Sequence, residues 1–244
     1  MQDRYAGDVG DFGKLGMIRQ IANTGLKVGI NWFLAYKPDE HDKEDGKHIG
    51  YFINSLFQGC DDELLNKLKQ IVEENRSVAA IERSNFVPGA RHYSAILKPG
   101  SDKTFSRDIW FRNSLDALAD SDIIFCDPDN GLLVKSVSPV SSKSDKYVME
   151  NELVTYYTAG KSVVFYNHRC REKEEVYLRR FAPLRQHSVF ENAECRGLKF
   201  ARGTVRDYIF ILQPYHYEKV NGAIESMMKT DWNRHFLPLN INQP

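Results

Sequence analysis

The segment DIIFCDPDNGL, residues 122–132, decides the fold. Residues Ile123–Cys126 form a short continuous apolar run, which is typical of a strand that is covered on both faces. The turn DPDN, residues 127–130, follows at once and places two carboxylates and an amide at the C-terminal end of that strand. Open α/β sheets build their sites at this edge, although Asp-Pro and Asn-Gly are also ordinary turn signals. The segment therefore predicts an α/β sheet with a candidate site at its mouth, and a plain turn is the alternative.

Helices and strands are predicted to alternate on both sides of this segment. Apolar spacing and capping residues predict helices at 13–25, 61–76, 106–121, 151–160 and 172–184. Short apolar runs predict strands at 26–36, 77–83, 122–126 and 161–169. Two further β-like runs, 187–200 and 206–212, are joined without a helix, which predicts an antiparallel hairpin. The fold class is therefore α/β, with a mostly parallel sheet and an antiparallel C-terminal hairpin.

The length and composition indicate one domain. With 244 residues and 42% hydrophobic content, the chain can bury one large core. We expect a single domain over residues 1–244, with an N-terminal helical lead-in and surface loop insertions at 37–48 and 136–146. The first residues lack a basic-then-apolar signal pattern, and the longest apolar stretch, residues 28–36, is too short to span a bilayer. A cytoplasmic location without a membrane partner is expected.

The cysteines predict neither a disulfide framework nor a zinc site. Cys60, Cys126, Cys170 and Cys195 are scattered and form no CxxC pair. We expect all four to be reduced thiols.

The formal net charge is zero, which argues against a bulk electrostatic grip on nucleic acid. The charge is nevertheless uneven, because residues 161–206 hold 11 Lys plus Arg against 5 acidic residues, a local balance of 11 − 5 = +6. Residues 36–75 hold 5 Lys plus Arg against 10 acidic residues, a balance of 5 − 10 = −5. The basic third could face phosphate, and solvated helix faces are the alternative explanation.

Two motifs resemble one family of enzymes. The turn at 127–130 follows its strand as the D/N-P-P-aromatic motif does in Rossmann-like S-adenosylmethionine-dependent methyltransferases that modify exocyclic amines. The N-terminal YAGDVGDFGK is similar to the A-G-x-x-x-D-x-x-K segment of ribosomal RNA adenine-N6 methyltransferases, matched here by Ala6, Gly7, Asp11 and Lys14. The resemblance implies a Rossmann-like three-layer sandwich whose last strand inserts antiparallel beside its predecessor.

The resemblance also implies a substrate and catalytic residues. The methyl donor would be S-adenosylmethionine, and the acceptor an exocyclic amine of a base in RNA or DNA. Asp127 and the Pro128 carbonyl would accept the two N–H bonds of that amine and aim its lone pair at the methyl group. Asn130 occupies the position of the aromatic residue that stacks on the flipped base in the family.

The cofactor contacts are implied less directly. Lys14 would meet a carboxylate or phosphate and Asp11 would orient it, beside the backbone of Gly7. A glycine-rich GxGxG turn is missing, and residues 28–31, which end at Asn31, are its nearest candidate. Glycines at every third position from 7 to 16 could let backbone N–H groups approach an anion. Close helix packing explains them equally well.

His168 ends the strand predicted at 161–169, between Asn167 and Arg169, and should emerge on the same rim as Asp127. A histidine titrates near neutral pH, so His168 could act as acid, base or ligand, and Arg169 could contact the substrate. A hydrogen-bonded structural histidine is the alternative.

The segment 82–93 contains further candidates. Glu82 ends a predicted strand and could bind a ribose hydroxyl of the cofactor, or cap the loop. Arg83 and Arg91 lie among aromatic residues, a mixture suited to phosphate contact and base stacking. Solvated loop residues would give the same pattern.

Two other functions fit the same residues. Asp8, Asp11, Asp127, Asp129 and His168 could surround Mg²⁺ or Mn²⁺ in a metal-dependent phosphodiesterase or nuclease, because hard cations prefer clustered carboxylates. A catalytically inert nucleotide-binding module is the third possibility. The sequence leaves the oligomeric state open.

Overall fold

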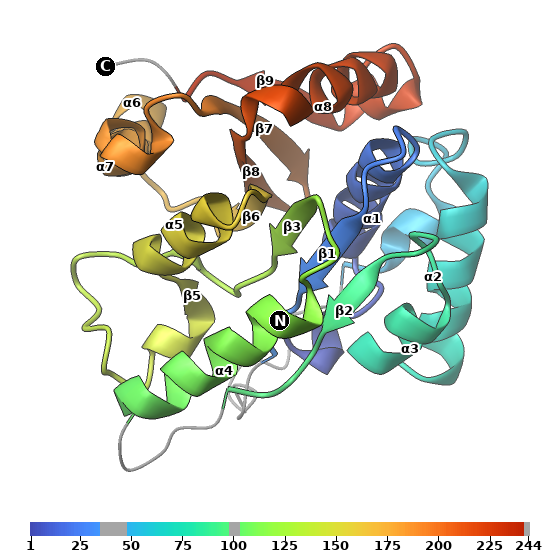
Figure 1. Ribbon diagram of the computed structural model, residues 1–244. Helices are drawn as coiled ribbons and strands as arrows, with labels where there is room; N and C mark the ends of the chain where they lie inside the picture. The colour runs from blue at the N-terminus through green and yellow to red at the C-terminus, as the bar shows by residue number, and fades with distance from the viewer. Residues whose placement is uncertain (35–47, 98–102, 242–244) are drawn as a thin grey trace.

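The computed structural model describes residues 1–34, 48–97 and 103–241 of the chain (Figure 1), and within helix 103–117 the side chains from residue 106 on. The charged segment predicted as a loop at 37–48 lies outside the described residues except for His48.

A seven-stranded sheet forms the centre of the described part of the chain, in the order β2-β1-β3-β6-β8-β7-β9. Its strands are β1 (Val28–Asn31), β2 (Arg91–Tyr93), β3 (Ile123–Cys126), β6 (Ser162–His168), β7 (Glu194–Arg202), β8 (Thr204–Leu212) and β9 (Phe236–Leu239). The pairs among β2, β1, β3 and β6 are parallel, whereas β8, β7 and β9 are joined by antiparallel pairs. Strands β4 (Gly131–Leu132) and β5 (Tyr147–Val148) form a separate parallel pair.

Helices cover both faces of the sheet (Figure 1). The helices that pack on one face are α1 (Val9–Ala22), α2 (Asp62–Glu74), α3 (Val78–Arg83) and α8 (Pro214–Met227). The helices that pack on the other are α4 (Lys103–Ala117), α5 (Glu150–Thr158), α6 (Glu174–Leu178) and α7 (Ala182–Gln186). Short 3₁₀ turns lie at η1 (Asp3–Tyr5), η2 (Gly50–Ile53), η3 (Ser144–Lys146), η4 (Arg179–Phe181), η5 (Ser188–Phe190) and η6 (Asp231–Arg234).

Strand β3 shows why a continuous apolar run was needed. All four of its residues are buried, and the side chains alternate between the two cores. Ile123 and Phe125 pack with the α1 side, while Ile124 and Cys126 pack with the α5 side. The predictions of an α/β class, a mostly parallel sheet and an antiparallel C-terminal hairpin are confirmed, with β7 and β8 paired from Glu194↔Leu212 to Arg202↔Thr204.

One predicted strand is wrong. Residues 77–83 contain helix α3, because the Ser77 side chain accepts a hydrogen bond from Ala80 N and so caps a helix there. The Asp3 carboxylate also accepts from Val78 N, which satisfies another free amide of the first turn. Helix α8 and strand β9 were not predicted.

Helix α1 lies close to the C-terminal strands because of its glycines. A Cβ atom at Gly10, Gly13 or Gly16 would lie 2.3–2.5 Å from a side-chain atom of Arg206, Phe200 or Trp232, respectively. This contact supports the close-packing interpretation of the glycine repeat. No described helix has the length and apolarity to cross a bilayer.

Candidate functional site

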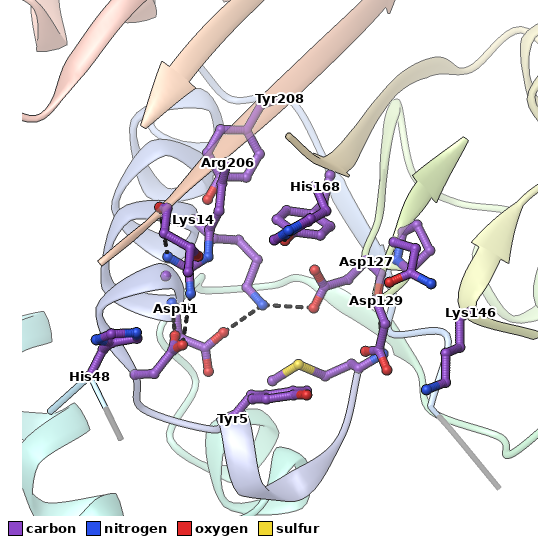
Figure 2. Close-up of a pocket in the computed structure, with 17 residues that line it drawn as sticks. Tyr5, Asp11, Lys14, His48, Asp127, Asp129, Lys146, His168, Arg206 and Tyr208 are labelled. Carbon is purple, nitrogen blue, oxygen red and sulfur yellow. Dashed lines mark hydrogen bonds and ion pairs between the residues drawn. The ribbon is translucent and has the colours of Figure 1, made fainter. Parts of the chain in front are cut away.

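A cavity of about 320 Å³ opens where β3 and β6 end, between the first turns of α1 and strand β8 (Figure 2). Its size lies within the range of small-molecule sites. The lining residues are Met1, Tyr5, Asp8, Gly10, Asp11, Lys14, His48, Asp127, Pro128, Asp129, Asn130, Lys146, Tyr166, His168, Thr204, Arg206 and Tyr208. The turn after β3 and the N-terminal segment therefore meet in one pocket.

Lys14 is the centre of this pocket. Its ammonium lies 2.6 Å from Asp11 Oδ1 and 2.7 Å from Asp127 Oδ2, and Figure 2 shows it between the two carboxylates. All three side chains are buried, and Asp127 Oδ1 makes no hydrogen bond to any described residue. Lys14 thus fixes Asp127 through Oδ2 and leaves Oδ1 for a ligand.

The local backbone explains why Asp11 and Lys14 are so placed. Asp8 caps α1 by accepting a hydrogen bond from Asp11 N at 3.0 Å, which sets the first turn. Asp11 Oδ2 accepts from Gly7 N at 2.8 Å, and Gly7 has φ 77°, a conformation that glycine adopts without strain. One helical turn then brings Lys14 onto the same face as Asp11.

Burial and charge act in opposite directions on these groups. Burial raises the pKa of Asp11 and of Asp127, and the Lys14 charge opposes that rise. Although burial opposes its charge, the two carboxylates raise the pKa of Lys14 above its ordinary value. The ammonium therefore stays charged across the physiological range.

Arg206 closes one wall of the pocket. Its guanidinium lies 2.8 Å from Asp8 Oδ2 and also donates to the carbonyls of Arg202 and Thr204. The helix cap and the C-terminal hairpin are thereby joined.

The second carboxylate of the turn has a different partner. Asp129 Oδ1 lies 2.7 Å from the Met1 amino group, and its Oδ2 accepts from the Gln2 amide at 2.8 Å. Although burial alone would raise the pKa of Asp129, these contacts and Lys146 hold it below the ordinary value. Asn130 is partly exposed at the pocket and its backbone N donates to Lys146 O.

Two strands contribute aromatic and imidazole groups. Tyr166 and His168 on β6 are joined by a 3.2 Å contact between the phenol oxygen and Nδ1. Tyr208 on β8 is fully buried and lines the pocket.

Asn167 and Arg169 lie behind the pocket. Asn167 Oδ1 accepts from Leu132 N at 2.9 Å, and its Nδ2 donates to the Tyr177 hydroxyl at 2.7 Å, so this side chain holds the DPDN turn against β6. Arg169 forms ion pairs with Asp207 at 2.9 Å and Glu174 at 2.5 Å. The structure places Arg169 in this network and not among the pocket residues.

Gly7, which was also predicted, contacts Asp11 through its backbone but does not line the pocket, and four other predicted residues are not brought to it. Asn31 is buried, donates to the Tyr156 hydroxyl and accepts from Phe33 N. Glu82 and Arg83 end helix α3, and Arg91 begins β2, where it lies 3.5 Å from Asp120. None of these four side chains lines the described cavity.

The predicted set omitted several pocket residues. Arg206 and Tyr208 on β8 share one face of the strand, as do Tyr166 and His168 on β6. Alternation along the strand, counted from His168, could have indicated Tyr166. No comparable signal points to Lys146, which a turn brings to the site.

The carboxylates of the proposed metal cluster do not converge. Asp8, Asp11, Asp127 and Asp129 are each paired with a cation, and no group of three metal-binding side chains occurs within the described residues. The donor set therefore does not fit a Mg²⁺ or Mn²⁺ cage, which needs several oxygens directed at one point.

No family model matches this sequence, and a search of curated proteins also gives no match.

Proposed function

We propose that this chain is an S-adenosylmethionine-dependent methyltransferase with a Rossmann-like fold that acts on the exocyclic amine of a base in RNA or DNA. The main support for this proposal is the 2.7 Å contact between Lys14 Nζ and Asp127 Oδ2. It joins the two motifs that resemble the methyltransferases, although 113 positions separate them. Two motifs that resembled the family by chance would have no reason to meet in one pocket.

The strand order supports the same proposal. Strand β8 follows β7 in the chain but lies between β6 and β7, antiparallel to both. An antiparallel last strand inserted beside its predecessor is the arrangement that the resemblance implied. The further strand β9 extends the sheet beyond it.

The pocket residues would act on the amine as follows. An exocyclic amine is a weak nucleophile because its lone pair is delocalised into the ring. Asp127 Oδ1 and the Pro128 carbonyl would accept its N–H bonds and hold the lone pair toward the methyl group, which S-adenosylmethionine supplies when bound. Lys14 holds Asp127 in place, and its charge opposes the rise that burial causes in the pKa of Asp127. Asn130 would contact the base edge where relatives stack an aromatic ring.

The charges that line the pocket are balanced. Four carboxylates, those of Asp8, Asp11, Asp127 and Asp129, stand against four cations, the Met1 amino group, Lys14, Lys146 and Arg206, so the lining has no net positive charge that would repel a sulfonium. Asp11 and Lys14 are the residues that we expect to hold the amino-acid end of the cofactor.

Calorimetric titration with S-adenosylmethionine is the first test, followed by transfer of a labelled methyl group to cellular RNA and to DNA. We expect micromolar binding without added metal, and loss of transfer in Asp127→Ala with binding of the donor retained. The matched control is Asp122→Ala, because Asp122 flanks the other end of β3, where it accepts from Lys27 N. Mg²⁺ or Mn²⁺ binding that disappears in Asp127→Ala, with no donor binding, would replace this proposal by the phosphodiesterase.

A further inference from the structure

Tyr166 and His168 connect the pocket with the surface of the molecule. Both line the cavity, where Tyr166 is partly buried and His168, at the end of β6, is exposed. The Tyr166 hydroxyl lies 3.2 Å from His168 Nδ1. The His168 backbone N also donates to the Asn130 carbonyl at 3.3 Å, so His168 stands beside the DPDN turn, on the same side of the cavity as Asp127 in Figure 2. One hydrogen bond therefore separates a pocket hydroxyl from a ring that reaches solvent.

The phenol is the donor in this hydrogen bond. Burial raises the pKa of Tyr166, and the pocket carboxylates add to the rise, although the Arg206 charge opposes it. The phenol therefore keeps its proton at neutral pH. Among the described residues the hydroxyl has no second hydrogen-bond partner, so donation to Nδ1 is the arrangement that satisfies its O–H. Neutral His168 then carries its ring proton on Nε2 and offers the lone pair of Nδ1 to the phenol.

The sheet places both rings among the charged walls of the pocket. In the antiparallel pair of β6 and β8, Tyr166 lies opposite Tyr208 and His168 lies opposite Arg206. The charged groups that line the cavity around them come from every neighbouring element: Asp8 from α1, Asp127 and Asp129 from the turn after β3, Lys146 from η3 and Arg206 from β8. Each of these carboxylates is already paired with a cation, which disfavours its taking up a proton.

The proposed reaction leaves a proton to be removed from this pocket. An amine that takes a methyl group gains a positive charge and must lose one N–H proton to become neutral. A proton that stayed on Asp127 would stop the carboxylate from accepting the N–H of the next amine. The pocket therefore needs a second group that takes the proton, together with an exit to solvent.

We propose that Tyr166 and His168 form a relay that passes this proton from the pocket to solvent. The inference rests on the proposed function. The N–H bond of the methylated amine breaks and an O–H bond forms at the Tyr166 oxygen, while the original Tyr166 O–H bond breaks and its proton joins His168 Nδ1. The imidazolium then releases one proton to the solvent. The positive charge that the methyl group brought to the amine thus leaves the protein.

Nitrogen NMR of the His168 ring tests the relay without any substrate. In neutral wild type, the proton should be on Nε2, and the Nδ1 signal should show a hydrogen bond from the phenol. In Tyr166→Phe, the Nδ1 signal should move to that of an imidazole without this bond. The matched control is Tyr215→Phe, because Tyr215 is exposed on α8 and its hydroxyl donates to the Gly160 carbonyl at 2.8 Å. Equal Nδ1 signals in wild type and Tyr166→Phe would overturn the inference.

The pH dependence of methyl transfer to cellular RNA and to DNA tests the catalytic role. In wild type, kcat should rise through the neutral range as His168 loses its proton and can accept another. His168→Gln and Tyr166→Phe should each lower kcat about 100-fold and remove this inflection. The double variant should be no slower than either single variant, because both residues act in one relay. Tyr215→Phe should keep the wild-type profile.

Three kinetic results would contradict the relay. They are losses that multiply in the double variant, a neutral inflection that persists in His168→Gln, and a wild-type kcat in either single variant.

Titration with S-adenosylmethionine separates this inference from the proposed function. Donor binding should be unchanged in Tyr166→Phe and in His168→Gln. Donor binding and methyl transfer that are equal in wild type and both variants would overturn the relay alone. Absence of donor binding in wild type would overturn the proposed function, and the relay with it. Donor binding lost in either variant would assign that residue to the donor and overturn its role in proton transfer.

Discussion

Two buried ion-pair clusters in this molecule have similar chemistry, but they differ in how many of their hydrogen-bonding groups have partners. Arg107 on α4 meets Glu152 on α5 through two contacts of 2.7 and 3.0 Å, and two further donors of Arg107 reach the carbonyls of Ser144 and Tyr147. Glu152 also accepts from Met149 N. Both carboxylate oxygens of Glu152 and four of the five Arg107 donors therefore have partners.

The Lys14 cluster is built differently. One ammonium is shared by two carboxylates, and Asp127 Oδ1 and the Tyr208 hydroxyl make no hydrogen bond to the described residues. A closed cluster such as that of Arg107 stabilises the join between helices, whereas an open one keeps binding capacity in the folded state. Both clusters are buried, so burial does not distinguish the structural ion pair from the candidate site. The presence of polar atoms without a hydrogen-bond partner does.

Breaking the closed cluster should have the largest effect on stability. Arg107→Met leaves a buried Glu152 without its cation, and the free energy of unfolding should fall by about 3–5 kcal/mol. Urea denaturation measures this, with Arg112→Met as the control, because Arg112 is exposed on the same helix. A loss below about 1 kcal/mol would mean that the pair is no stronger than a surface ion pair.

Lys14→Met should cost less, about 2–3 kcal/mol at pH 7, because protonation can neutralise the two buried carboxylates that it leaves without a cation. Burial already raises the pKa of Asp11 and Asp127, and loss of Lys14 raises both further. Protonation would then neutralise both groups as the pH falls, so the deficit relative to wild type should shrink between pH 7 and about pH 4. Unfolding curves at both pH values, with the exposed Lys67→Met as control, test the sign. A deficit that grows in acid would contradict it.

Asn167→Ala should lower the free energy of unfolding by about 1–3 kcal/mol, because Leu132 N and the Tyr177 hydroxyl each lose a hydrogen bond. The DPDN turn is then less firmly held, so donor binding should also weaken. Calorimetry on this variant and on Asn113→Ala, which is exposed on α4, separates the two effects. Equal affinity for S-adenosylmethionine in wild type, Asn167→Ala and Asn113→Ala would show that the DPDN turn keeps its conformation without the Asn167 hydrogen bonds.

Asp127→Asn should change stability least. The amide can still accept from Lys14, and it removes a charge that burial disfavours, so the change in unfolding free energy should be at most about 1 kcal/mol. Methyl transfer should fall but stay measurable, since an amide is a poorer acceptor than a carboxylate and the D/N-P-P-aromatic motif allows either residue at this position. In wild type, transfer should fall on acidification with an inflection above pH 3.8, because burial raises the pKa of Asp127. Unfolding of this variant at 25 °C would show that the turn is structural.

Much of the fold could be predicted because local chemistry and tertiary packing agree there. Strand β3 needed apolar residues on both faces, and its sequence contains nothing else. Residues 77–83 were predicted wrongly because Val78 and Ile81 suit either state, and the Ser77 cap decided for the helix. In α8, Val220, Ile224 and Met227 recur at helical spacing, which is a signal that could have been used.

The site was predictable only where a motif marks it. Asp127, Asp11 and Lys14 were predicted from two motifs, and they line one pocket. Arg206 and Tyr208 could not be predicted because their role depends on which strand β8 joins. Their neighbours across the sheet, His168 and Tyr166, come from β6. The sequence of neither strand alone predicts that these two strands pair.

The contact between Asp8 and Arg206 has a consequence for how the molecule is made. These residues are 198 positions apart, so the pocket closes only after the segment from Asp8 to Arg206 has left the ribosome. Contacts of such long sequence separation also tend to form slowly. During synthesis, the protein should therefore become able to bind a ligand in this pocket only after the β7–β8 hairpin has packed against α1.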